Sequence, residues 1–193
     1  MLKPALAALD IADSPQSWRV LGFAVVDEQR IHLGGVELRL GSGGHGITAW
    51  AVSNADDLEL VPTTSLPEVI RSDHHPNGAS GIDHVVITTP DFDAAAGALE
   101  HAGLPFARVR QATPEMRQGF RRLGPAIMEV VEAPTTPAPA FWGLTVIVAD
   151  LELLREHAGA HLGDVRPAVQ PGRHIATLSR DAGLSTRVAF MTP

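Results

Sequence analysis

Two polar side chains interrupt apolar runs at positions where they could do chemistry. His84 stands in the β-branched run of residues 82–87, and Glu129 stands between Met128 and Val130. A carboxylate in an apolar strand must face a wet cavity or have a partner, because burying an unpaired charge is costly. An imidazole and a carboxylate together suit a divalent cation such as iron, manganese, nickel or zinc, and the carboxylate can move a proton. A hydrogen-bonded interior histidine is the alternative for His84.

The elements around these two residues are predicted to be a strand, a helix and three further strands. Residues 81–93 pass from a β-branched run through Thr-Thr-Pro-Asp into the alanine-rich run 94–102, which indicates a strand followed by a helix. Because side chains alternate along a strand, His84 lies on the face opposite Val85 and Ile87 and faces a concavity. Gly and Pro signals separate three short β-type runs, at residues 106–110, 116–123 and 127–132.

A weaker echo of this β-α-β-β-β pattern follows a proline-rich connection at residues 133–139. It comprises a strand at 141–148, a helix at 151–162 and strands at 174–178 and 187–191. Asp150 occupies the position at the start of this helix that Asp91 occupies in the central unit. Counting seven residues back from each aspartate places Gly143 where the central unit has His84. The position that corresponds to Glu129 falls on Ala189.

The N-terminal part is predicted to be a degenerate module in altered order. We expect a short helix in residues 1–13, a second helix from Pro15 that Asp13 or Ser14 caps, and strands at 23–26, 30–33 and 36–40. Residues 46–53 supply the remaining strand after these three strands instead of before them. The expected organisation is a degenerate N-terminal module (1–62), a linker (63–80) in which His74 and His75 are polar filler, a central module (81–132) and a C-terminal module (141–193).

The β-α-β-β-β unit resembles the repeating module of the vicinal oxygen chelate superfamily, which includes glyoxalase I, bleomycin-resistance proteins and extradiol dioxygenases. The resemblance implies an α+β fold in which the curled mixed sheets of tandem modules form a cup. It also implies metal ligands on the first and last strands of each module, where His84 and Glu129 match the pattern and Gly143 and Ala189 do not. A third ligand would have to be Glu37, which aligns with Glu129, or a residue of a second copy in a homodimer.

Two classes of function follow from the resemblance. The first is a glyoxalase-like enzyme, a divalent-metal-dependent lyase, isomerase or dioxygenase that holds its metal at His84 and Glu129 and uses Glu129 or Glu37 as the base. The second is a metal-free protein of the bleomycin-resistance type that binds or sequesters a small molecule. In either class the ligand is a small oxygen-rich or carbonyl-containing molecule. We predict that the central and C-terminal modules share the cup, which leaves Glu37 outside it.

Substrate contacts are expected on the strands and turns next to the cup. Residues 117–122 form a polar, arginine-rich strand, and alternation directs every second side chain into the cup, where it would hold an anionic or carbonyl group. A solvated sheet edge is the alternative for this strand. The candidate substrate-binding residues are Gln118, Phe120, Trp142, Arg173 and His174.

Composition excludes several other functions. The 193 residues carry 15 basic and 22 acidic side chains and a net charge of -7, so we expect no nucleic-acid partner. The absence of cysteine removes disulfides, thiolate nucleophiles and zinc-thiolate sites. Residues 1–13 lack the pattern of a signal peptide, and no run approaches membrane-spanning length. We therefore expect a cytoplasmic protein without a membrane partner.

Overall fold

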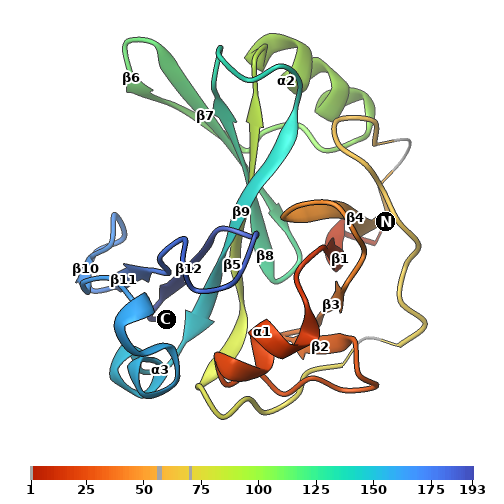
Figure 1. Cartoon of the computed structure of the whole chain (residues 1–193). Coiled ribbons are helices and arrows are strands. Elements are labelled where there is room, and N and C mark those ends of the chain that lie inside the picture. Colours follow the sequence, from red (N-terminus) through yellow and green to blue (C-terminus); the bar gives the residue numbers. More distant parts are fainter. Residues whose placement is uncertain (1, 56–57, 70) are drawn as a thin grey trace.

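Strands dominate the fold and form two sheets, one of four strands and one of eight (Figure 1). The computed structural model describes residues 2–55, 58–69 and 71–193. The predicted N-terminal module and linker therefore include a few residues that lie outside the described ranges. No helix within these ranges has the length and apolar character needed to cross a membrane.

The central module follows the predicted order. Its elements are β5 (Ala79–Thr89), α2 (Phe92–His101), β6 (Arg108–Thr113), β7 (Met116–Leu123) and β8 (Ala126–Glu132). Pro90 ends the strand, and the Asp91 side chain accepts a 2.9 Å hydrogen bond from the Ala94 amide at the start of α2. β8 returns parallel to β5, and β7 and β6 extend the sheet beyond it.

The C-terminal module repeats this strand order. Its elements are β9 (Ala140–Val148), α3 (Leu151–Ala158) with the short η1 helix (Gly159–His161), β10 (Arg166–Pro167), β11 (His174–Thr177) and β12 (Val188–Met191). Asp150 caps α3 as Asp91 caps α2. The two-residue strand β10 is too short to give a sequence pattern, and the sequence did not predict it.

Antiparallel pairing of β5 with β9 joins the two modules into one eight-stranded sheet, in the order β10-β11-β12-β9-β5-β8-β7-β6. Figure 1 shows β6 and β7 on one arm and β10 to β12 on the other, both extending to the same side of the central β5–β9 pair. The predicted α+β fold, with tandem modules around a cup, is confirmed.

The N-terminal elements are β1 (Ala5–Ile11), α1 (Pro15–Val20), β2 (Arg30–Leu33), β3 (Val36–Leu40) and β4 (Ile47–Ser53). The helix predicted in residues 1–13 is wrong, because the chain forms β1 there. β1 is buried on both faces, so its apolar residues do not alternate, and such a run cannot be distinguished from a short helix by periodicity. The strand predicted at 23–26 is also absent; Val26 makes only an isolated bridge to Arg30.

The N-terminal sheet is a shortened version of the same module. β1 pairs in parallel with β3, as β5 does with β8. β4 pairs antiparallel with β1, as β9 does with β5. The leading strand thus comes first, as in the other modules, and β4 occupies the place of the first strand of a following module.

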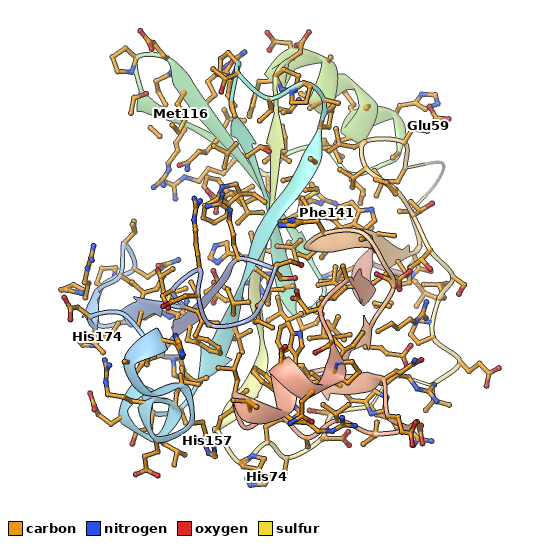
Figure 2. The ribbon with its side chains drawn as sticks, viewed as in Figure 1. Glu59, His74, Met116, Phe141, His157 and His174 are labelled. Carbon is orange, nitrogen blue, oxygen red and sulfur yellow. The ribbon has the colours of Figure 1, made fainter. Side chains whose placement is uncertain are left out.

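The larger hydrophobic core among the described residues draws side chains from both sheets. Trp50 on β4 packs edge to face against Phe141 on β9, with 5.6 Å between the ring centres, and joins the two sheets. Figure 2 shows Phe141 where β9 passes the N-terminal sheet. His75 is buried and not polar filler: its Nδ1 accepts a hydrogen bond from the Ala24 amide, and its Nε2 contacts the His32 carbonyl.

Candidate functional site

The cup of the eight-stranded sheet contains two adjoining cavities. The first, of ≈ 760 Å³, includes Arg108 and Arg110 in its wall and is called the arginine cavity. The second, of ≈ 820 Å³, includes Trp142 and is called the tryptophan cavity. Three residues line both: Glu129, Thr145 and Ile175. Glu129 therefore lies where the two cavities meet.

Glu129 faces the cup because β8 alternates. Ile127 and Val131 lie on the same strand face and also line the cup, whereas Met128 and Val130 are buried in the core. Burial raises the pKa of the Glu129 carboxyl above its usual value, and the positive charges of His84 and Arg110 only partly offset this effect. A carboxyl group with a raised pKa at the junction of two cavities is suited to exchanging a proton with a ligand.

His84 lines the arginine cavity together with Glu129, and a β-bulge shapes its surroundings. In the pairing of β5 with β9, Ile82 lies opposite Val146 while His84 lies opposite Thr145, so Asp83 is an extra residue. A bulge of this kind turns two consecutive side chains toward the same side of a sheet. As a result the Asp83 carboxylate contacts Nδ1 of His84.

Asp83 is a site residue that the sequence did not reveal. Strict alternation would place it on the face opposite His84, and a bulge leaves no signal in a single sequence. Burial opposes its ionisation, but the contacts with His84 and Arg173 outweigh that effect and hold the pKa of Asp83 below its usual value. An ionised Asp83 favours a proton on Nδ1 of His84, which leaves Nε2 available to a ligand.

Arg173 was predicted to bind substrate, but its guanidinium group is engaged by the protein. Its Nη2 lies 2.7 Å from a carboxylate oxygen of Asp83, and its Nε donates a 2.6 Å hydrogen bond to the Thr192 carbonyl. The C-terminal module thereby fixes the carboxylate that contacts His84 of the central module.

Three of the other predicted substrate contacts line the cup. Gln118 lies in the tryptophan cavity and accepts a 2.6 Å hydrogen bond from Nε of Arg110. Phe120 lies in the arginine cavity, and the Arg110 guanidinium stands 5.4 Å from its ring centre. Trp142 lines the tryptophan cavity and is 49% exposed.

His174, at the start of β11, is exposed and is not among the described residues that line either cavity. Figure 2 shows it on the arm of the cup that lies across from Met116. Its backbone N–H donates a 2.9 Å hydrogen bond to the Thr192 hydroxyl, so the structure gives it a place at the end of β11 and no contact with His84 or Glu129.

The arginines of β7 do not supply the positive charge of the cup. Arg117 makes ion pairs with Glu132 and Asp93, and Arg121 donates to the Pro105 carbonyl. The alternate residues of β7 that face the cup include Gln118 and Phe120, whereas Arg122, two residues further along, is exposed and is not among the described residues that line either cavity. Arginine reaches the cup from β6, whose alternating Arg108 and Arg110 were the available signal.

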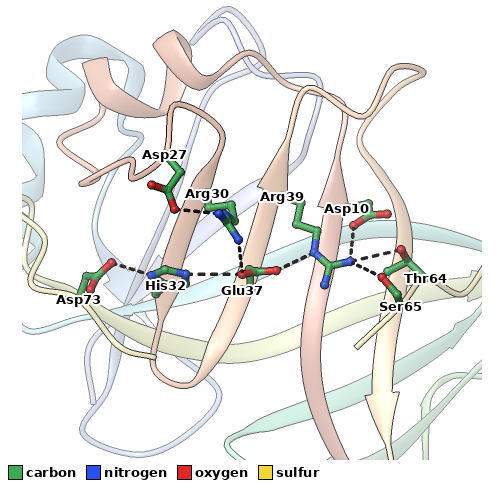
Figure 3. Close-up of polar contacts among 9 residues, drawn as sticks. All are labelled: Asp10, Asp27, Arg30, His32, Glu37, Arg39, Thr64, Ser65 and Asp73. Atoms are coloured by element: carbon green, nitrogen blue, oxygen red, sulfur yellow. Dashed lines mark hydrogen bonds and ion pairs between the residues drawn. The ribbon is translucent and has the colours of Figure 1, made fainter. Parts of the chain in front are cut away.

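Glu37 lies outside the cup. It stands on β3 of the N-terminal sheet, where Nε of Arg39 lies 2.7 Å from one carboxylate oxygen and Nε2 of His32 lies 3.5 Å from the other (Figure 3). His32 in turn contacts Asp73 of the predicted linker at 2.9 Å. The parallel register places Glu37 opposite Ala8, as it places Glu129 opposite Val86. The sequence alignment of the two glutamates is thus consistent with the register, but Glu37 cannot join His84.

The donor set of the cup does not fit a resident mononuclear metal. Within the described ranges no three His, Asp or Glu side chains converge to hold an ion. The parallel registers pair Val86 with Glu129 and Thr145 with Ala189, so Gly143 and Ala189 correspond to His84 and Glu129. Neither has a donor. Two protein ligands are fewer than a stable site requires.

Titration with manganese or nickel is therefore expected to give only weak binding to the wild-type protein. Glu37→Ala should bind the metal as the wild type does, because Glu37 lies in the other sheet. Calorimetry on both proteins checks this. Tight wild-type binding that collapses in Glu37→Ala would contradict the pairing of modules described above, and tight binding in both proteins would point to a ligand from a second copy in a homodimer.

Comparison with known proteins supports the fold. No family model and no curated protein matches the sequence. A triple mutant of 4-hydroxymandelate synthase from Streptomyces coelicolor is similar in structure, with a TM-score of 0.64, 13% identity, and coverage of 99% of this chain and 93% of that chain. Methylmalonyl-CoA epimerase from Mycobacterium tuberculosis gives a TM-score of 0.49, 15% identity, and coverage of 65% and 93%. The first likeness extends over both sheets, and the chain therefore has the fold of the vicinal oxygen chelate superfamily.

Proposed function

We propose that the cup binds a small oxygen-rich or carbonyl-containing molecule and that Glu129 exchanges a proton with it. The observation that carries the proposal is the position of Glu129. This half-buried carboxyl with a raised pKa lies at the junction of two cavities that together are large enough for a metabolite-sized ligand. His84 lines the same cavity, within range of the charge interaction that acts on Glu129.

The chemistry available to these two groups is removal of a proton from a carbon next to a carbonyl. The C–H bond breaks, the proton passes to the Glu129 carboxylate, and the electron pair moves to the carbonyl oxygen. Asp83 holds the ring of His84 at Nδ1, so Nε2 is the ring nitrogen left to hydrogen-bond that oxygen as its charge develops. A carboxyl whose pKa is raised toward neutrality is a stronger base than an ordinary glutamate.

Glu129→Gln is expected to separate binding from proton transfer. With benzylacetone, a neutral ketone that carries a phenyl ring, as the probe, saturation-transfer NMR should detect binding to the wild type. In D₂O the protons next to the carbonyl should exchange. The variant should slow the exchange at least about 100-fold, since general-base catalysis contributes on that order, while its amide keeps the shape and the binding. Glu100→Gln, on the exposed side of α2, is the matched control.

The same variant has an expected stability signature. The pKa of Glu129 is raised in the folded protein, so its contribution to stability is present below the unfolded-state pKa and is lost as the pH rises through the folded-state pKa. Glu129→Gln should therefore unfold at a higher urea concentration than wild type at pH 7, and the difference should disappear near pH 4. A large loss of stability at pH 7 would identify Glu129 as a structural partner.

Binding of benzylacetone without exchange would favour the second function, a metal-free sequestering protein like the bleomycin-resistance branch of the fold. The feature that supports this alternative is the lack of donors at Gly143 and Ala189. Absence of binding would contradict both functions.

A further inference from the structure

Arg108 and Arg110 bring two positive charges to the wall of the arginine cavity. Within the described ranges neither guanidinium group makes an ion pair, whereas Arg117 on β7 and Arg173 in the loop before β11 do. Glu129 is the one carboxyl group among the described residues that line this cavity. The cavity is therefore locally positive in a chain whose net charge is -7.

Arg110 is held in place by uncharged partners. Gln118 accepts a 2.6 Å hydrogen bond from its Nε, and the Phe120 ring centre lies 5.4 Å from its guanidinium carbon. These contacts use one N–H and one face of the group and leave the N–H groups of both terminal nitrogens for a ligand. A planar guanidinium with free N–H groups binds a carboxylate through paired hydrogen bonds.

Protection of a sheet edge does not account for this arrangement. β6 is an edge strand, and edge strands often carry charges that prevent pairing with another chain. Such charges prevent pairing with another chain whichever face of the strand they lie on. On β6 the two arginines share the cup-facing parity, and the opposite parity carries the uncharged Val109 and Gln111.

The position of the arginines relative to Glu129 sets the length of a ligand that reaches both. Arg108 pairs with Phe120, and Phe120 pairs with Glu129, in one row across β6, β7 and β8. With strands about 4.8 Å apart, the Cα atoms of Arg108 and Glu129 are about 10 Å apart along the sheet. An arginine side chain spans much of that distance. The anionic group of a ligand can therefore lie a few bonds from the carbon atom whose proton Glu129 removes.

The tryptophan cavity, on the other side of Glu129, is more apolar. Its wall includes Val86, Met116, Val131, Trp142 and Val188. The Arg187 guanidinium lies 5.1 Å from the Trp142 ring centre and covers one face of it. This cavity is suited to an apolar or aromatic body.

We infer that the ligand is an amphipathic oxo acid: a carboxylate held by Arg108 and Arg110, a carbonyl a few bonds away at Glu129 and His84, and an apolar body in the tryptophan cavity. This inference rests on the proposed function and names the class of molecule that the same site takes. It adds Arg108 and Arg110 as residues that determine specificity.

Three probes separate the parts of this ligand: benzoylpropionate, its uncharged methyl ester, and levulinate, in which a methyl group replaces the phenyl ring. Calorimetry at low salt should show benzoylpropionate binding to the wild type at least about 10-fold more tightly than either of the others, because the ester lacks the charge and levulinate lacks the apolar body. Added salt should weaken binding of the acid and leave binding of the ester unchanged.

In the Arg108→Ala/Arg110→Ala double variant the acid should lose at least about 10-fold in affinity, while the ester binds as before. Arg19→Ala/Arg71→Ala removes two charges from exposed positions outside the lining of both cavities and should change neither affinity. The unchanged ester serves as the internal check that the double variant is folded.

Equal wild-type affinities for acid and ester, or a preference for the acid that survives the double variant, would overturn the inference. In those cases binding of the ester or of benzylacetone would still support a carbonyl ligand in the cup, so the proposed function would stand. If the acid, the ester and benzylacetone all fail to bind, the inference and the proposed function fail together.

Discussion

Asp13→Ala is expected to lower the free energy of unfolding by about 3 kcal/mol, because hydrogen bonds to a buried charge contribute about 1.5–3 kcal/mol each. Asp13 is 5% exposed. One of its carboxylate oxygens accepts hydrogen bonds from the Ser185 amide at 2.5 Å and the Ser185 hydroxyl at 2.6 Å, and the other accepts from the Thr186 amide at 3.2 Å. For a chain of this length the loss corresponds to a fall in Tm of roughly 10 °C.

Two further variants identify the cause of that loss. Ser185→Ala removes the hydroxyl bond to Asp13 and also the 2.8 Å hydrogen bond that this hydroxyl accepts from the Gly46 amide, and it should cost about 2 kcal/mol. Asp164→Ala makes the same substitution at an exposed position and should change the free energy of unfolding by less than about 0.5 kcal/mol. Urea unfolding checks all three. If Asp13→Ala resembles Asp164→Ala, the carboxylate does not hold the segment before β12 to the N-terminal sheet.

Asp13 also illustrates what a sequence can and cannot predict. The residues before Pro15 were expected to include the cap of a helix, and either Asp13 or Ser14 was chemically suitable. Ser14 is the cap, with a 3.2 Å hydrogen bond from the Ser17 amide. Asp13 instead binds a segment about 170 residues away. Local chemistry identifies a cap, but only the tertiary fold decides which of two candidates is left for a distant partner.

The two complete modules were predictable because turn and helix-capping residues mark the ends of their first strands. Thr-Thr-Pro-Asp ends β5 and Asp150 begins α3, so the strand-to-helix boundaries were visible before the structure. A helix cap, Ser14, follows β1 as well, but burial of β1 on both faces removes the alternation that would mark it as a strand. The same local information thus gave the correct order in two modules and a helix in place of a strand in the third.

The candidate site was predictable in part for a similar reason. Glu129 was recognisable because a carboxylate in an apolar strand requires an explanation, and the structure places it beside a cavity with His84. Asp83 and Arg173 were beyond sequence reasoning in their observed roles. One depends on a bulge that interrupts alternation, and the other depends on the direction taken by a loop.

The asymmetry of the cup follows from packing as well as from chemistry. The central module places His84 and Glu129 in the cavity, whereas the C-terminal module places Gly143 and Ala189 at the corresponding positions. A side chain at position 143 would need space beside β12. The structure allows no such space, because a Cβ atom built on Gly143 would lie 2.4 Å from the Arg187 carbonyl oxygen.

Gly143→Ala is accordingly expected to destabilise the protein by roughly 3 kcal/mol, at the upper end of what overpacking costs. The nearest atom is the backbone carbonyl oxygen of Arg187, which accepts a 3.0 Å hydrogen bond from the Leu144 amide. Relief of the clash would therefore disturb the pairing of β9 with β12. Gly143→His adds a larger side chain and should destabilise the protein more than Gly143→Ala. Urea unfolding measures both variants.

Gly97→Ala is the matched control and should have the opposite sign. Gly97 lies in α2, where an added Cβ meets nothing within 4 Å, and alanine is favoured over glycine in a helix by roughly 0.5–1 kcal/mol.

If Gly143→Ala is instead as stable as wild type, β12 can shift to admit a side chain. The missing ligand would then reflect substitution at one residue, and nickel titration of Gly143→His could test directly whether an added imidazole completes a donor set with His84 and Glu129. If Gly143→Ala is destabilised as expected, the close approach of β12 to β9 is what limits the cup to one pair of donors, and proton transfer by Glu129 becomes the chemistry that this packing permits.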